Sequence, residues 1–399
     1  MIPALQTVFS VSEELAESRC VYMKKNVKRD PVKVMLKWTI ILAVIAVVAY
    51  VGGNLLTGYR AQLLADRQAA VEEINRQRDQ EYAVALAEFE QANTSGGNLA
   101  WPAQRTEGWD VVDLTNYPLE NPGRVTVSRQ DLMYNGMLLV NQWHSRPDDF
   151  VDTEVVSVGN YTGWKLPVSD GNVRLFPKAI DALQAAVAEA AEAGHKDYMV
   201  SEGYCSWDDQ NAMFQSRMEQ LQGRYSGTAL VEQAKKYVNY PGTSEFNSGL
   251  AFTLRLYNRE DASVGRPDYH TTAAGQWMSE NCWKHGIVFR FQLADFPLKG
   301  SADKSFKTGI SSELYLYRYV GKGNATVMHI LDLCMEEYVE YLQEYPHIAV
   351  FQDGALKYEI YRQYVGDDVT SIALELAGKA KSYEASLDNM GGVITVFEY

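Results

Sequence analysis

The longest apolar stretch of the chain lies near its amino terminus. Residues 38–59 contain no charged side chain and are mostly aliphatic between Ile40 and Val51. As a helix, this stretch is long enough to cross the roughly 30 Å hydrocarbon core of a bilayer. Residues 24–37, just before it, contain six lysines and arginines against one aspartate. This flank predicts that residues 1–37 are cytoplasmic and that the rest of a single-pass membrane protein is extracytoplasmic.

A cleaved signal peptide is the alternative for this stretch. We favour a transmembrane helix because the apolar run exceeds a usual signal core and no clear Ala-x-Ala site follows it. Residues 1–22 carry no membrane signal, and Met23 could itself be a start. Whether residues 1–22 are translated naturally is therefore left open.

The polar pattern that follows predicts a stalk. Residues 60–92 are rich in Ala, Gln, Glu and Arg and contain no Gly or Pro, which favours a helix. Apolar positions give only a partial stripe, and no heptad pattern is sustained. Pairing of two such helices through a coiled coil remains an alternative. Residues 93–98 break the helix. We interpret residues 60–126 as a helical stalk and linker.

Clearer periodicity appears in the second half of the chain. Residues 178–193 have apolar positions at helical spacing between Pro177 and Gly194, and residues 198–201 are typical of a strand. Residues 326–344 predict another helix. From Pro346 the pattern changes to two hairpins, one around residues 352–355 and one around residues 388–392. We expect residues 346–399 to form a small β-rich appendage.

Charge and cysteine content narrow the possible partners. The net charge is −14, and residues 1–37 contain seven basic and four acidic side chains, so the remainder carries about −17. This charge repels polyanions and argues against nucleic acid. The four cysteines are Cys20, Cys205, Cys282 and Cys334, with no Cys-x-x-Cys. We expect buried thiols at Cys282 and Cys334, with neither a disulfide framework nor a structural zinc site.

Two segments carry a recognisable motif pattern. Residues 241–254 read Pro-Gly-Thr-Ser-Glu-Phe-Asn-Ser-Gly-Leu-Ala-Phe-Thr-Leu, and residues 308–321 read Thr-Gly-Ile-Ser-Ser-Glu-Leu-Tyr-Leu-Tyr-Arg-Tyr-Val-Gly. The first resembles the Ser-Glu-His-Gln-x-Gly-Leu-Ala-x-Asp-Leu motif of VanY-type D-alanyl-D-alanine carboxypeptidases. The second resembles their Thr-Gly-Ile-x-x-Glu-Pro-Trp-His-x-Arg-Tyr-Val-Gly motif. Residues 201–210 resemble the family's Ser-x-Gly-Tyr-Arg-Ser-x-x-x-Gln, and residues 138–150 and 277–287 also fit.

The resemblance covers residues 127–345 and implies an α+β fold, a small antiparallel sheet with helices packed on it. It also implies a zinc peptidase site, but the family's three metal-ligand positions hold Phe246, Thr253 and Leu316. Phe246 and Leu316 offer no donor atom, whereas a catalytic zinc needs three nitrogen, oxygen or sulfur ligands from the protein. Glu313 occupies the position of the family's general base. Because zinc must first activate the water, we expect this base to be idle and no cofactor to be bound.

The remaining candidates are contacts to a ligand. The resemblance places Tyr204, Ser206, Gln210, Ser244 and Arg318 at a substrate cleft, where Cys205 replaces the family's arginine. Two alternatives remain. A relocated zinc site could use His270, Asp268 or Glu313. Cys205 could act as a nucleophile, although no adjacent His can be placed beside it.

The sequence therefore predicts a membrane-anchored, extracytoplasmic D-alanyl-D-alanine carboxypeptidase-like protein of a cell-wall-bearing bacterium. We expect a catalytically inactive pseudopeptidase that binds a peptidoglycan stem peptide or a wall-enzyme partner. An active zinc D,D-carboxypeptidase that trims terminal D-Ala with non-standard ligands is the alternative. A purely structural partner of the wall-synthesis machinery is a third possibility.

Overall fold

The computed structural model describes residues 36, 39–44, 47, 62, 108–366 and 369–399. Residues 108–366 and 369–399 belong to one compact unit. Most of the predicted membrane span, almost all of the predicted stalk, and Cys20 lie outside the described residues. Among the residues that are described, no helix combines the length and the apolar character that crossing a bilayer requires.

A four-stranded antiparallel sheet forms the centre of the domain. Its strands run in the order β5-β6-β8-β7, and each neighbouring pair is antiparallel. They are β5 (Tyr198–Glu202), β6 (Ala251–Leu256), β7 (Ile287–Phe289) and β8 (Leu316–Tyr319). The α+β class and the strand predicted at residues 198–201 are confirmed.

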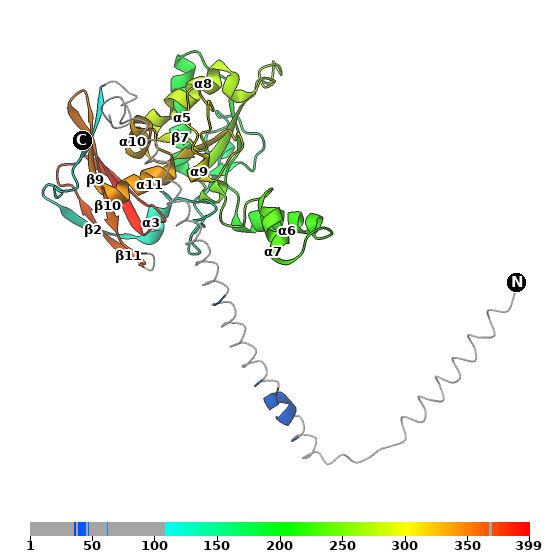
Figure 1. Ribbon diagram of the computed structural model, residues 1–399. Coiled ribbons are helices and arrows are strands. Elements are labelled where there is room, and N and C mark those ends of the chain that lie inside the picture. The colour runs from blue at the N-terminus through cyan, green and yellow to red at the C-terminus, as the bar shows by residue number, and fades with distance from the viewer. Residues whose placement is uncertain (1–35, 37–38, 45–46, 48–61, 63–107, 367–368) are drawn as a thin grey trace, which may run out of the picture. The chain divides into compact units, whose positions relative to one another are not determined.

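Two helices pack against this sheet. Helix α5 (Pro177–Glu192) contacts β7, β8 and α8 (Ala273–Asn281), and Figure 1 shows α5 and α8 together beside β7. Pro177 is at the first turn of α5, where a missing N–H costs nothing. Ile180, Leu183 and Ala186 are fully buried on its inner face. The predicted helix at residues 178–193 is confirmed.

A second sheet is built from carboxyl-terminal strands and one strand near residue 110. Its strand order is β1-β9-β10-β13-β12, and a separate pair joins β11 to β2. These strands are β1 (Trp109–Asp113), β2 (Gly123–Ser128), β9 (His347–Gln352), β10 (Ala355–Tyr364), β11 (Ser371–Leu376), β12 (Ser382–Leu387) and β13 (Gly392–Glu398). Both predicted hairpins are confirmed, because β9 pairs with β10 and β12 pairs with β13.

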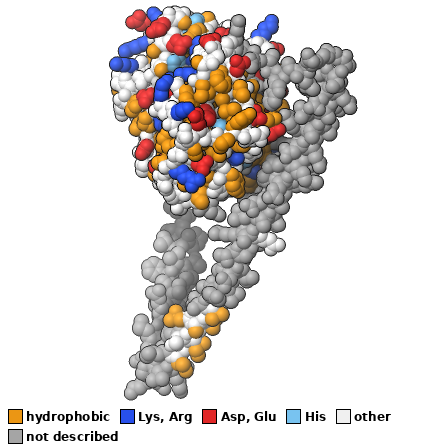
Figure 2. Space-filling model, turned by 90° about the vertical axis from the view of Figure 1, so that its left-hand side faces the viewer, with side chains coloured by type: hydrophobic (Ala, Val, Ile, Leu, Met, Phe, Trp, Pro, Cys, Tyr) orange, Lys and Arg blue, Asp and Glu red, His pale blue; other side chains and the backbone are white. Residues whose placement is uncertain are grey.

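The carboxyl-terminal strands share cores with the rest of the domain. Leu374, Leu387 and Val393 are buried in the same cluster as Leu132 and Leu183. Residues on both sides of the predicted boundary at 345/346 therefore pack together. Figure 2 turns the side of the domain that carries this sheet toward the viewer and shows acidic, basic and hydrophobic side chains interspersed on that face.

Helices α10 (Lys322–Leu331) and α11 (Met335–Glu344) connect the two sheets. Helix α10 contacts both β7 and β13, and Figure 1 shows both helices between the sheets. The prediction of one helix over residues 326–344 was wrong. Asp332 adopts a left-handed conformation with φ 55°, and the backbone N–H of Cys334 donates to Glu337, which begins the second helix.

The remaining elements are short, apart from a helical pair that leaves the domain. The pair is α6 (Trp207–Leu221) and α7 (Gly227–Lys235). The short elements are α3 (Arg129–Met133), α4 (Val158–Tyr161), α9 (Ser305–Thr308), η1 (Glu245–Ser248), η2 (Tyr269–Thr271), η3 (Cys282–His285), β3 (Val156–Ser157) and β4 (Arg174–Leu175). Cys282 and Cys334 are buried free thiols, as predicted.

Candidate functional site

The three family ligand positions meet on the central sheet. Phe246 lies in η1, Thr253 in β6 and Leu316 in β8. Thr253 and Leu316 are direct partners in the antiparallel ladder, which places their side chains on one face. Leu316 is buried in an apolar cluster against which Phe246 packs. The fold thus brings together the positions that the motifs align, and two of them hold apolar side chains that belong to or pack against one cluster.

The residues at this point do not fit a zinc ion. Phe246 and Leu316 have no donor atom, and the Thr253 hydroxyl donates a long hydrogen bond of 3.5 Å to Glu202 Oε2. A catalytic zinc needs three nitrogen, oxygen or sulfur ligands. Within residues 108–366 and 369–399, His, Cys, Asp and Glu nowhere gather in threes suited to a metal. This includes the relocated site considered for His270, Asp268 and Glu313.

Tyr315, the residue before Leu316 in the chain, packs against the main core and not against the cluster that contains Leu316. His270 Nδ1 lies 3.0 Å from the Tyr315 hydroxyl, and the two rings stack with centroids 5.7 Å apart. Burial raises the pKa of Tyr315, and the carboxylates of Asp268 and Glu313 raise it further. Glu313 itself is exposed, and no described residue donates a hydrogen bond to its carboxylate. The retained base position therefore faces solvent beside aromatic rings.

Tyr204 lies among polar partners next to this site. Its hydroxyl donates to Asp152 Oδ2 at 2.7 Å and accepts from Arg146 Nη1 at 3.3 Å. The Arg174 guanidinium lies 5.3 Å from the centre of its ring. Burial raises the pKa of Tyr204, and the hydrogen bond to Asp152 raises it further. The phenol is therefore neutral at physiological pH, and its hydroxyl is held by these two partners in a buried position.

Cys205 lacks the environment of a nucleophile. Burial raises the pKa of its thiol to about 11, and Asp209 adds to this rise, which Arg174 only partly offsets. A reactive cysteine needs a lowered pKa, since the thiolate is the attacking species. The arrangement of groups gives the nucleophilic-cysteine alternative no support.

Three of the predicted contact residues stabilise local structure. The Ser206 hydroxyl accepts from the Asp209 N–H at 3.0 Å and caps α6. Ser244 caps η1 in a reciprocal arrangement with Asn247. Gln210 is buried, and its Nε2 donates to the Asn239 carbonyl at 2.8 Å. These structural roles follow directly from the geometry. That Ser206, Ser244 and Gln210 also contact a ligand stays a prediction.

Arg318 is directed into the protein. Its Nη2 donates to the carbonyls of Gly136 and Leu138 at 2.8 Å each, and its Nη1 donates to Glu245 Oε2 at 2.7 Å. The side chain is fully buried. The structure gives Arg318 an internal role behind the site, and the predicted contact to a ligand stays a prediction.

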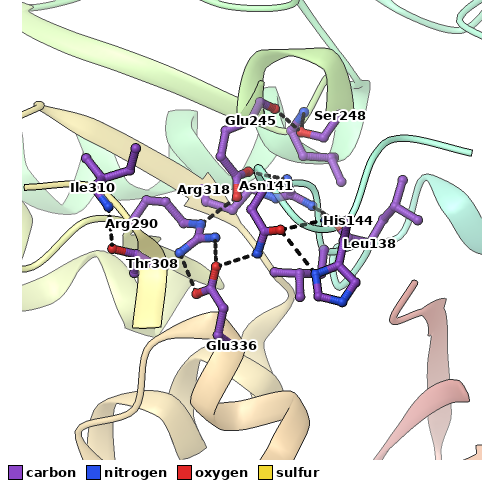
Figure 3. A network of polar contacts seen from close by, with 12 residues as sticks. Leu138, Asn141, His144, Glu245, Ser248, Arg290, Thr308, Ile310, Arg318 and Glu336 are labelled. Carbon is purple, nitrogen blue, oxygen red and sulfur yellow. Dashed lines mark hydrogen bonds and ion pairs between the residues drawn. The ribbon is translucent and has the colours of Figure 1, made fainter. Parts of the chain in front are cut away.

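Arg318 belongs to a buried charge network that sequence reasoning missed (Figure 3). Arg290, which follows β7, bonds Glu245 Oε1 and makes two bonds to Glu336 at 2.6 and 2.9 Å. Burial raises the pKa of Glu336, but the charge of Arg290 outweighs this effect and leaves the pKa below its usual value. Two arginines and two glutamates therefore balance each other in the core. The one sequence signal is an arginine directly after an apolar strand.

The network extends to the loop at residues 141–146. Asn141 Nδ2 donates to Glu336 Oε1 at 2.9 Å, while its Oδ1 accepts from the N–H groups of Trp143 and His144. The same loop donates the Arg146 N–H to the Gly242 carbonyl at 2.7 Å, beside the first motif. The network thus fixes the positions of η1, β8, α11 and this loop around the site.

A separate cavity of about 390 Å³ lies away from the site. It is lined by residues of α5, α10 and the carboxyl-terminal sheet, including Lys178, Lys322 and Glu384. Lys178 Nζ bonds Glu384 at 2.6 Å, and the Tyr319 hydroxyl lies 3.4 Å from the same carboxylate. These groups satisfy one another, so we do not assign the cavity a role in the site.

Comparison with known proteins finds similarity to carboxypeptidases. Residues 172–322 match the family model described as VanY, D-alanyl-D-alanine carboxypeptidase. A D-alanyl-D-alanine carboxypeptidase of Enterococcus faecium is 26% identical over 283 residues, which cover 70% of this chain and 80% of that protein. Putative carboxypeptidase YodJ of Bacillus subtilis (strain 168) is 26% identical over 305 residues, covering 76% and 96%.

A solved structure shares the fold. It is that of the vancomycin resistance D,D-dipeptidase VanXYg in complex with a D-Ala-D-Ala phosphinate analog. The TM-score is 0.52 at 22% sequence identity, and the match covers 70% of this chain and 99% of that chain. At this identity the comparison supports a common architecture.

Proposed function

Over residues 172–322 the chain belongs to the VanY family of D-alanyl-D-alanine carboxypeptidases, and from this premise we propose a pseudopeptidase. In this proposal the domain binds a peptidoglycan stem peptide or a wall-enzyme partner and does not cleave it. The observation that carries the proposal is that two family ligand positions hold apolar side chains, with Phe246 packed against the cluster that contains Leu316. The third position, Thr253, offers only a neutral hydroxyl.

The chemistry of hydrolysis supports the loss of activity. In a zinc peptidase the metal lowers the pKa of its bound water, and a carboxylate then takes the proton. Glu313 keeps the carboxylate, but the positions that would hold the metal supply no set of donors. A lone exposed glutamate has no activated water to act on, so we expect it to be idle.

The retained scaffold supports binding. Tyr204 keeps a neutral phenol that is 7% exposed and held by Asp152 and Arg146, and Phe246 packs against the apolar cluster that contains Leu316. In this proposal the polar group around Tyr204 and the apolar cluster give an extended peptide one polar side and one apolar side. We propose that the cleft accepts the end of a stem peptide in this way.

We further propose that the domain is held at the outer face of the cell membrane. The uncharged stretch at residues 38–59 and its basic flank support this location. Placement outside the membrane would bring the domain to the cell wall, where the stem peptide is found.

Two readouts on the purified full chain test the function. Stem pentapeptide ending in D-Ala-D-Ala is titrated by calorimetry, and release of D-Ala is measured in parallel with and without added zinc. We expect binding without release, and weaker binding for Tyr204→Ala than for Tyr364→Ala, an exposed tyrosine on β10. Zinc-dependent release would instead establish an active carboxypeptidase. Absence of binding at millimolar peptide would leave only the protein-partner form of the proposal.

A further inference from the structure

The α6–α7 pair, defined here as the helical arm (residues 207–240), stands out from the domain beside the candidate site. The chain enters the arm directly after Ser206 and returns through Pro241 to Ser244, so two motif segments form its base. Gln210 Nε2 donates to the Asn239 carbonyl at 2.8 Å and closes this base. Figure 1 shows α6 and α7 extending away from the sheets. The base of the arm is therefore formed by segments of the candidate site.

Large apolar side chains are exposed on this arm. The exposed fractions are 43% for Trp207, 63% for Tyr237 and 42% for Tyr240. The two helices bury only Gln210, Phe214 and Ala234. Grouped exposed rings on a polar projection are typical of a surface that meets a ligand.

Tyr240 and Tyr237 lie against α6. Phe214 contacts Tyr240 with ring centroids 5.3 Å apart, and the Arg217 guanidinium lies 4.7 Å from the centre of the Tyr237 ring. Trp207 and Phe214 are seven residues apart and so share a helix face. From residue 207 to residue 217 the helix advances about 15 Å. Rings held in this way lose little freedom on binding, which favours affinity.

The charge of the arm selects among possible ligands. Residues 207–240 contain four acidic and four basic side chains, so the arm is neutral, whereas the chain as a whole carries −14. The arm is also rich in amides, and Gln215, Gln220 and Gln222 are exposed. A neutral surface of rings and amides suits an uncharged polysaccharide, because rings stack on the apolar faces of sugars and amides bond their hydroxyls.

We propose that the helical arm binds the glycan strand of the cell wall, with Trp207, Tyr240 and Tyr237 stacking against successive sugar rings. The inference rests on the proposed function, since a stem peptide in the cleft is covalently attached to such a strand. The ligand class is a strand of N-acetylated hexosamines. The arm would then hold the strand while the cleft holds the peptide.

The test separates the two parts of the ligand. Soluble glycan strands freed of stem peptides are titrated into the purified full chain, and free stem peptide is titrated separately. We expect Trp207→Ala and Tyr240→Ala each to weaken glycan binding by about two- to tenfold, with peptide binding unchanged. The control is Tyr364→Ala, because Tyr364 is 80% exposed and lies on β10. Tyr237→Ala provides a second arm variant that disturbs no packed residue of the arm base.

Three results would overturn the inference while leaving the peptide-binding proposal intact. The first is absence of glycan binding by the wild-type protein. The second is an equal loss of glycan binding in the arm variants and in Tyr364→Ala. The third is a change in self-association of the chain by sedimentation in the arm variants, with glycan binding unaltered, which would identify the arm as a contact between copies. Loss of peptide binding alone would instead count against the proposed function.

Discussion

The buried charge network gives the sharpest test of what stabilises the site. Arg290 is 1% exposed and bonds both Glu245 and Glu336. Replacing it with Met leaves Glu336 with the Asn141 amide as its remaining side-chain donor. A buried charge that loses its partner costs about 3–5 kcal/mol. We therefore expect Arg290→Met to lower the free energy of unfolding by about this amount.

The double variant Arg290→Met/Glu336→Leu should recover much of the loss. It removes one charge of each sign, and the pair between Arg318 and Glu245 at 2.7 Å remains. We expect the double variant to cost at least about 2 kcal/mol less than the sum of the two single variants, as for residues in one network. Lys379→Met is a control, because Lys379 and Glu120 form an exposed pair at 2.6 Å that is worth under about 1 kcal/mol.

Urea unfolding followed by tryptophan fluorescence measures these differences. The midpoint and the slope are compared among the wild-type, single, double and control proteins, because an unchanged slope shows that the midpoint reports stability. The reasoning is refuted if each single variant costs no more than Lys379→Met. It is refuted equally if the double variant costs the full sum of the singles.

Three smaller predictions address other parts of the fold. Burial lowers the pKa of His347, but hydrogen bonds to Glu359 and to a backbone carbonyl outweigh burial and leave this pKa above its usual value. The protonated side chain therefore stabilises the fold below the ordinary histidine pKa, and this stabilisation is lost as pH rises through the pKa of the folded state. The stability gap between wild type and His347→Gln should be larger at about pH 6 than at about pH 8; a constant gap would contradict this. Asn389→Ala removes two hydrogen bonds to the backbone carbonyls of Leu139 and Ser145 and should lower the unfolding free energy by about 1–3 kcal/mol. An unchanged urea midpoint would contradict this prediction. Cys205, which is partly buried and has a pKa near 11, should react with a thiol reagent at neutral pH far more slowly than in the urea-unfolded protein, and equal rates would refute this protection by the fold.

Local patterns along the chain predicted local structure well. The apolar face of α5 between Pro177 and Gly194 needs only helix periodicity, and both carboxyl-terminal hairpins follow from turn residues between apolar runs. The break between α10 and α11 escaped prediction because no Gly or Pro marks Asp332. It depends on a left-handed residue and a cap at Cys334, which packing selects.

Pairings between distant residues could not be predicted. Strand β1 was interpreted as linker, yet it pairs with β9 more than 230 residues later. Such a pairing leaves no periodic signal in either segment. The motifs predicted that Phe246, Thr253 and Leu316 would meet, since they align with known ligand positions. The charge network around Arg290 joins four separate segments, so the sequence carries no pattern that would reveal it.

Zinc binding tests the central claim most directly. Calorimetric titration of zinc into the purified wild-type chain should show no stoichiometric site. The variant Phe246→His/Thr253→Asp/Leu316→His should bind one equivalent of zinc. In this variant two of the new ligands are ladder partners, and the third packs against the cluster that contains one of them. One tightly bound zinc per wild-type chain, accompanied by D-Ala release that Glu313→Gln abolishes, would contradict the account.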